Sequence, residues 1–262
     1  MSKLGINSNI LKIIAIIAVI FDHIGVYFYN TFNPITVVYL RIIGRIAMPI
    51  FAFLIVQGFF HTKDLAKYVK RLFISGIITQ IIIYIMYTIN NFVFPEYVVL
   101  KDVLSINILI SFAISLIILK TIDNLIIKIE KKEKIEKQDI LLIIVSIMLL
   151  SLYFITDFDY SYMLIIYIIM LYVVHKVMIE KNAIKDKYIS KFVYNMFNLL
   201  SLLTFVIIYN SEIEYFAVLA IIFIALYNNE RGKDSKTIRR LFYLFYPLQH
   251  FLLYLTAMIS IV

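Results

Sequence analysis

Residues 11–25 read LKIIAIIAVIFDHIG, an apolar run that contains Lys12 near its start and Asp22 and His23 near its end. The run lacks the alternation of polar and apolar residues that a strand of a membrane barrel needs. With its neighbours it reaches the length of about 20 residues that a helix requires to cross the hydrocarbon core. The stretch therefore predicts a transmembrane helix over 10–30 with ionisable groups inside the membrane.

The rest of the chain has the same character. Hydrophobic residues make up 63% of its 262 positions and the mean hydropathy is +0.93, whereas soluble domains are roughly half apolar. We expect an all-α, polytopic integral membrane protein with about nine transmembrane helices, forming a single domain over residues 1–262. The predicted spans are 10–30, 35–60, 72–91, 103–122, 140–156, 161–179, 192–209, 213–229 and 241–261.

Basic residues give the orientation. All but Arg41, Arg45 and Lys101 of the 25 lysines and arginines fall on one side of the predicted spans. Because loops on the cytoplasmic side carry an excess of Lys and Arg, we predict the N-terminus inside and the C-terminus outside. The formal charge of +8 then reflects topology and contact with the lipid bilayer, and we expect no nucleic-acid partner. The predicted outer loops carry acidic residues instead: Glu96, Asp102, Asp157, Asp159, Glu212 and Glu214.

The chain contains no cysteine. Disulfides, thiolate zinc sites, iron–sulfur ligation and a cysteine nucleophile are therefore excluded. We expect no metal.

Four ionisable residues from three predicted helices fall in one layer of the membrane: Asp22, His23, Arg45 and His250. Charges at this depth cost several kcal/mol, so they are usually paired and functional. Arg41 and Arg45 are four residues apart and share a helix face, where they can clamp a carboxylate, with Asp22 as the natural internal partner. Asp22 and His23 lie about 100° apart, which argues against a dyad within one helix.

The residue types suggest chemistry. Burial favours a neutral imidazole at His23, which could accept a proton from an amine or a hydroxyl. Arg41 and Arg45 stay charged and could stabilise a developing oxyanion or hold an anionic substrate. The alternative is that Asp22 and the arginines form a purely structural pair between helices.

Several stretches resemble the TraX family of bacterial membrane proteins. These are LKIIAIIAVIFDHIG (11–25), LRIIGRIAMPIFAFLIVQGFFHT (40–62), KDLAKYVKRL (63–72), LYNNERG (226–232) and FYLFYPLQHFLLYL (242–255). The founding member is associated with acetylation of the pilin N-terminus in conjugation. The resemblance implies an acetyltransferase of the bacterial cytoplasmic membrane, with acetyl-CoA as donor and a peptide, pilin-like or small-molecule acceptor. It also implies a histidine two places after Pro247, where this chain has Gln249 and then His250.

The first predicted helix is also similar to that of membrane acyltransferases, in which a basic residue precedes a catalytic histidine by ten intervening positions. Lys12 and His23 have this spacing. Eleven residues advance a helix by about 16 Å along nearly one face, which suits coenzyme A with phosphates near Lys12 and thioester near His23. By the same resemblance, His61, Lys67 and Arg71 could bind the adenosine phosphates; the alternative is a positive-inside anchor.

The sequence thus predicts an acyl-CoA-dependent transferase acting on an amine or hydroxyl. The candidate catalytic residues are His23, Asp22, Arg41, Arg45 and His250, and the candidate cofactor-binding residues are Lys12, His61, Lys67 and Arg71. Two alternatives stay open: a secondary transporter, and a noncatalytic subunit of a secretion or conjugation apparatus.

Overall fold

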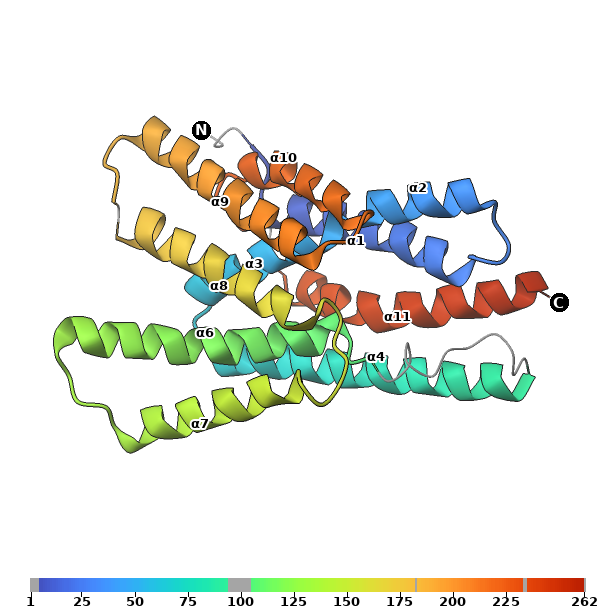
Figure 1. The fold of residues 1–262 in the computed structure, drawn as a ribbon, viewed down its shortest axis with the longest axis horizontal. Helices are drawn as coiled ribbons and strands as arrows, with labels where there is room; N and C mark the ends of the chain where they lie inside the picture. The colour runs from blue at the N-terminus through green and yellow to red at the C-terminus, as the bar shows by residue number, and fades with distance from the viewer. Residues whose placement is uncertain (1–4, 94–104, 182, 233–234, 262) are drawn as a thin grey trace. The chain divides into compact units, whose positions relative to one another are not determined.

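The computed structural model describes residues 5–93, 105–181, 183–232 and 235–261. Every regular element in these ranges is helical (Figure 1), which confirms the all-α prediction. Seven helices of the described residues are long and apolar enough to cross a membrane. The count of nine and the orientation remain predictions. Lys3, Glu96, Lys101, Asp102 and Lys233, which the charge pattern assigned to one side or the other, lie outside the described residues.

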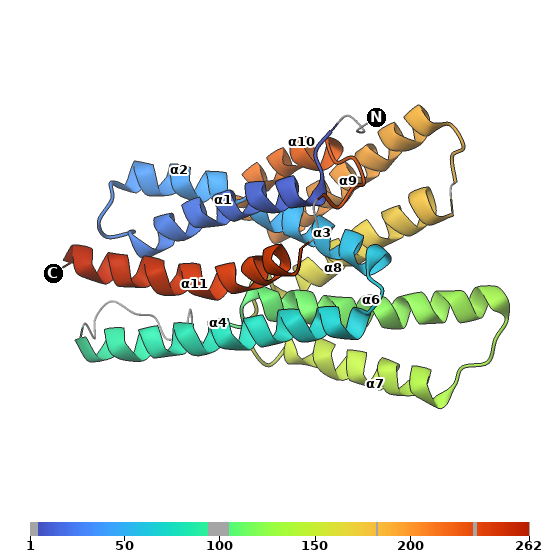
Figure 2. The same cartoon turned by 180° about the vertical axis from the view of Figure 1, so that it is seen from behind.

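The helices group into two compact units, one of residues 1–58 and 166–262 and one of residues 59–165. The second unit contains α4 (Leu65–Val93), α6 (Ile108–Lys131) and α7 (Lys137–Leu152). Figure 2 shows α6 and α7 as a helical hairpin. Ile106 N–H donates to the Asp157 carbonyl at 2.8 Å, so the chain entering α6 meets the chain leaving α7.

The first unit begins with α1 (Ser8–Tyr27), α2 (Pro34–Gly44) and most of α3 (Ala47–His61). It continues with most of α8 (Ser161–His175), the π-helical turn η1 (Lys176–Glu180), α9 (Lys187–Tyr209), the 3₁₀ segment η2 (Glu214–Leu219), α10 (Ala220–Ala225) and α11 (Lys236–Ile261). Helix α1 packs against α2 and α11 (Figure 2). Asn7 begins α1, because its side-chain oxygen accepts from the N–H groups of Asn9 and Ile10 at 3.0 and 3.1 Å.

The predicted span 35–60 is two helices, and a turn at Arg45 and Ile46 separates α2 from α3. Pro49 explains the break. It lacks the N–H that would donate to the Arg45 carbonyl, and its ring clashes with that carbonyl in a continuous helix. Pro49 is instead the third residue of α3, in the first turn, where no N–H is needed. The break therefore places Arg45 at a helix end.

Candidate functional site

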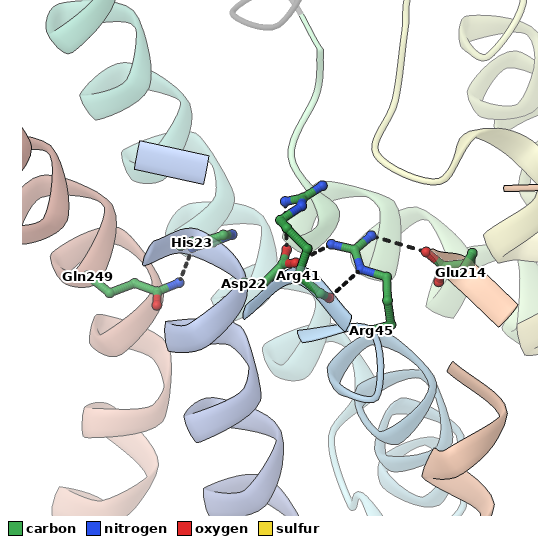
Figure 3. Close-up of polar contacts among 6 residues, drawn as sticks. All are labelled: Asp22, His23, Arg41, Arg45, Glu214 and Gln249. Carbon is green, nitrogen blue, oxygen red and sulfur yellow. Dashed lines mark hydrogen bonds and ion pairs between the residues drawn. The ribbon is translucent and has the colours of Figure 1, made fainter. Parts of the chain in front are cut away.

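Asp22 and His23 are consecutive on α1 and take part in two different clusters. Figure 3 shows Asp22 on the side of Arg41 and Arg45, and His23 on the side of Gln249. The separation follows from the step of about 100° per helical residue. The two side chains do not form a dyad, in agreement with the prediction from the sequence.

The first group, here called the Asp22 cluster, consists of Asp22, Arg41, Arg45 and Glu214. Arg41 Nη1 donates to Asp22 Oδ2 at 3.2 Å, and Arg45 Nη2 donates to Asp22 Oδ1. The partner that the sequence predicted for both arginines is therefore the one observed. Gly44 allows this approach, because a Cβ atom at that position would overlap the Asp22 side chain.

Each of the three guanidinium nitrogens of Arg45 donates to an acceptor. Its Nε donates to the Arg41 carbonyl at 3.3 Å and its Nη1 to Glu214 Oε2 at 3.1 Å, in addition to the bond to Asp22. Two carboxylates and two guanidinium groups give the cluster no net formal charge, the condition under which buried ions are tolerated. The arrangement joins α1, the α2–α3 break and η2.

Glu214 was missed as a site residue. The sequence assigned it to an outer loop with Glu212, whereas the structure leaves it 1% exposed at the start of η2. Its Oε1 has no hydrogen-bond partner among the described residues. The available signal was a carboxylate directly preceding the apolar run 215–227, but that position alone could not identify Arg45 as its partner.

The second group, the His23 cluster, consists of His23 and Tyr27 of α1 with Tyr246, Gln249 and His250 of α11. Gln249 Nε2 lies 2.9 Å from His23 Nδ1, and the Tyr27 hydroxyl lies 2.7 Å from His250 Nδ1. The two imidazole centroids are 4.4 Å apart. Tyr246 packs edge-on against both rings, at 5.9 and 4.9 Å. The predicted residues His23 and His250 are thus adjacent, although they are 227 positions apart in the chain.

Lys12 lies on the same side of α1 as His23. Its ammonium is 5.0 Å from the ring centroid of Phe242, and Phe242 precedes Gln249 by two turns of α11. Helices α1 and α11 therefore run in the same direction, with Lys12 and His23 contacting successive parts of one neighbour. The shared face that the spacing predicted is present.

His61, Lys67 and Arg71 belong to the unit of residues 59–165. His61 is exposed at the end of α3. Lys67 Nζ pairs with Asp64 at 2.8 Å, and this bond from Lys67 holds the pKa of the Asp64 carboxyl below its usual range. Their predicted role in binding adenosine phosphates stays a prediction. No group of three or more metal-ligating side chains occurs within the described ranges.

Comparisons with known proteins agree with the sequence resemblance. A family model described as "TraX protein" matches residues 7–257. The "Probable fimbrial assembly protein FimC, serogroup H1" of Dichelobacter nodosus is 40% identical over 70 residues, which are 27% of this chain and 28% of that protein. An uncharacterized protein of Rickettsia prowazekii is 37% identical over 103 residues, 39% of this chain and 32% of its own length. The matches thus span less than a third of either relative. No solved structure matches.

Proposed function

Because the chain belongs to the TraX family, we propose that it is a multi-pass protein of the bacterial cytoplasmic membrane with a role in pilus assembly or conjugation. We assign it an acyl-CoA-dependent transferase activity, with acetyl-CoA as donor. The acceptor is an amine or hydroxyl of a peptide, a pilin-like protein or a small molecule. The fimbrial description of one relative supports the choice of a pilin-like acceptor.

One observation carries the proposal: the imidazoles of His23, which is half-buried, and His250, which is buried, lie side by side within the membrane helices α1 and α11. His23 is 15 residues into α1, or about 22 Å along its axis. Histidines at such depth mark functional sites rather than interfacial anchors. Lys12 lies on the same face about 16 Å nearer the start of the helix, where it can bind the phosphates of coenzyme A.

The Asp22 cluster has a different role in this proposal. Its arginines are held by Asp22, Glu214 and a backbone carbonyl. We therefore assign Asp22, Arg41 and Arg45 to holding α1 against the α2–α3 break, so that His23 keeps its place beside α11. Direct stabilisation of an oxyanion by the arginines requires one of these ion pairs to open.

We further propose nine crossings with the N-terminus inside. The hairpin closure between Ile106 and Asp157 supports α7 as a crossing that returns along α6. Asn228 N–H donates to the Ile6 carbonyl at 2.9 Å, so the chain after α10 returns to the level at which α1 begins. Because Glu214 pairs with Arg45, the eighth predicted span, 213–229, starts inside the membrane.

The absence of native cysteine makes the topology directly testable. Asn30→Cys and Lys134→Cys place single thiols at exposed positions. A membrane-impermeant maleimide applied to intact cells should label Asn30→Cys, and should label Lys134→Cys only after permeabilisation. Labelling of Lys134→Cys in intact cells would contradict the orientation.

A second candidate function is transport of an anion or a proton. The helix break at Arg45 favours it, because broken helices next to charged side chains form the binding sites of many secondary transporters. A noncatalytic assembly subunit is the third candidate. It predicts that His23→Ala leaves pilus assembly or conjugation intact.

The test uses the purified protein in nanodiscs with radiolabelled acetyl-CoA and candidate peptides. Wild type should bind acetyl-CoA and label an acceptor, and His23→Ala should lose labelling by at least about a hundredfold. His175→Ala is the matched control, because His175 is also buried but contacts Gln57 and Tyr194 instead. If folded wild type binds no acetyl-CoA, the transferase proposal is wrong.

A further inference from the structure

Polar side chains from α3, α8 and α9 meet inside the first unit, and none of them belongs to the Asp22 cluster or the His23 cluster. Gln57 Nε2 donates to the Tyr194 hydroxyl at 3.1 Å and lies 3.1 Å from His175 Nδ1. The Tyr194 hydroxyl lies 3.4 Å from the same Nδ1. Gln57 and His175 are each 4% exposed. These three residues, here called the Tyr194 cluster, therefore join three helices through buried hydrogen bonds.

Asn198 lies next to the Tyr194 cluster. It follows Tyr194 by one turn of α9 and therefore shares its helix face. Asn198 is 1% exposed and approaches the Tyr194 hydroxyl, but neither its Nδ2 nor its Oδ1 reaches hydrogen-bond geometry with any residue of the described ranges. A buried amide without hydrogen bonds destabilises a fold, and native proteins rarely contain one. The amide of Asn198 therefore requires a further partner.

The burial of Asn198 limits what this partner can be. At 1% exposure, the side chain is out of reach of lipid headgroups and of side chains from another protein. A water molecule is small enough, and it both donates and accepts, as the two ends of an amide require. Buried waters in folded proteins typically make about three hydrogen bonds to polar groups that otherwise lack partners. Water is therefore the species that fits this position.

We propose that a water molecule binds between the amide of Asn198 and the hydroxyl of Tyr194, within the joint of α3, α8 and α9. Tyr194 then has one partner from α3, the Gln57 amide, and a second partner in the water. A bridging water is nearly as favourable in enthalpy as a direct hydrogen bond. Because polar contacts and close packing hold helices together in lipid, the water stabilises this joint. The hydration site is independent of the proposed transferase function.

The sign of a stability change tests whether the amide is bonded. Asn198→Leu replaces the amide with an apolar group of similar size. If water satisfies the amide, the variant loses these hydrogen bonds, and its unfolding temperature in nanodiscs should fall by about 2–4 °C. If the amide has no partner, the variant removes a destabilising group and the unfolding temperature should rise. A rise, or no change, would overturn the proposal.

Solid-state nitrogen-15 spectra of asparagine-labelled protein in lipid bilayers detect the water directly. Magnetisation is transferred from water protons to the side-chain amides, and comparison with Asn198→Leu or Asn198→Gln identifies the signal of Asn198. Wild type should show transfer from water to Asn198 although the residue is buried in a membrane helix. Loss of this transfer in Tyr194→Phe is expected as well, because the variant removes the second partner of the water. Absence of transfer in wild type would overturn the proposal.

Ser201→Ala is the matched control. Ser201 is also on α9 and is 3% exposed, but its hydroxyl donates to the Phe197 carbonyl of the same helix at 2.9 Å. The variant should therefore leave the transfer from water to Asn198 unchanged. Equal transfer in Tyr194→Phe and wild type would show that the water is not bound at Tyr194. Loss of the transfer in Ser201→Ala would show general hydration of α9 and would overturn the specific site.

Discussion

The two faces of α1 show opposite ways of burying polar groups. On one face, Asp22 pairs with Arg41 and Arg45, and Arg45 also pairs with Glu214, so each charged side chain has an opposite charge beside it. On the other face, His23 meets neutral aromatic and amide groups, and His250 keeps a buried nitrogen without a partner. Opposite charges that pair with one another indicate a structural joint between helices, whereas neutral side chains around a buried nitrogen without a partner indicate a place for a ligand. The predictions below test this division, from the largest expected effect to the smallest.

Arg45→Met should have the largest effect on stability. It leaves Asp22 with Arg41 alone and Glu214 without its ion-pair partner, and breaking a buried pair from one side costs about 3–5 kcal/mol. Unfolding in detergent, followed by circular dichroism, measures the loss. The double variant Arg45→Met/Glu214→Gln should recover part of it. A single variant as stable as wild type would contradict the structural role of the Asp22 cluster.

Gly44→Ala should disturb the same cluster from the backbone. The added Cβ overlaps the Asp22 side chain, and overpacking of this kind costs about 1–3 kcal/mol. Gly25→Ala is the control, since its Cβ would meet the flexible Arg41 side chain at 3.1 Å and should cost less. If the two variants are equally stable, Asp22 is not closely packed against α2.

His23→Phe should cost about 1–3 kcal/mol, less than Arg45→Met, because an aromatic ring of similar shape replaces the imidazole but the buried Gln249 amide loses its hydrogen-bond partner. The same variant should lose the transfer of acetyl groups from acetyl-CoA to the acceptor. Thermal unfolding in nanodiscs measures the first expectation. A stability loss as large as that of Arg45→Met would place His23 with the structural residues and remove the contrast between the two faces.

Loss of the exposed pair Asp64–Lys67 should have the smallest effect on stability. The bond from Lys67 lowers the pKa of Asp64 in the folded state. The pair therefore contributes to folding stability above the pKa of the unfolded state, about 3.9. This contribution is lost as the pH falls through the lower pKa of the folded state. The unfolding temperature of Asp64→Asn should therefore be slightly below that of wild type at pH 7, and the difference should shrink at lower pH. A difference that grows on acidification would contradict this sign.

The sequence predicted what depends on local pattern. Hydropathy located the long helices, the four-residue spacing joined Arg41 to Arg45, and the step of 100° separated Asp22 from His23. It did not predict the break at Arg45, although Pro49 was visible, because a proline can kink a helix or end it. Nor could it predict the contact of Glu214 with Arg45 or of Tyr27 with His250, which join residues 169 and 223 positions apart. Such contacts depend on which helices pack together, and periodicity within one helix does not contain that information.

The most direct test compares His23→Phe with Glu214→Gln, one variant from the chemical face of α1 and one from its structural face. Two quantities are measured on the same samples: the transfer of labelled acetyl groups and the free energy of unfolding. His23→Phe should lose transfer by at least about a hundredfold while it remains folded. Glu214→Gln should lose about 1–3 kcal/mol of stability, since a charged hydrogen bond is replaced by a neutral one, and should retain transfer when folded. Full transfer by stable His23→Phe would contradict the assignment of chemistry to the His23 face.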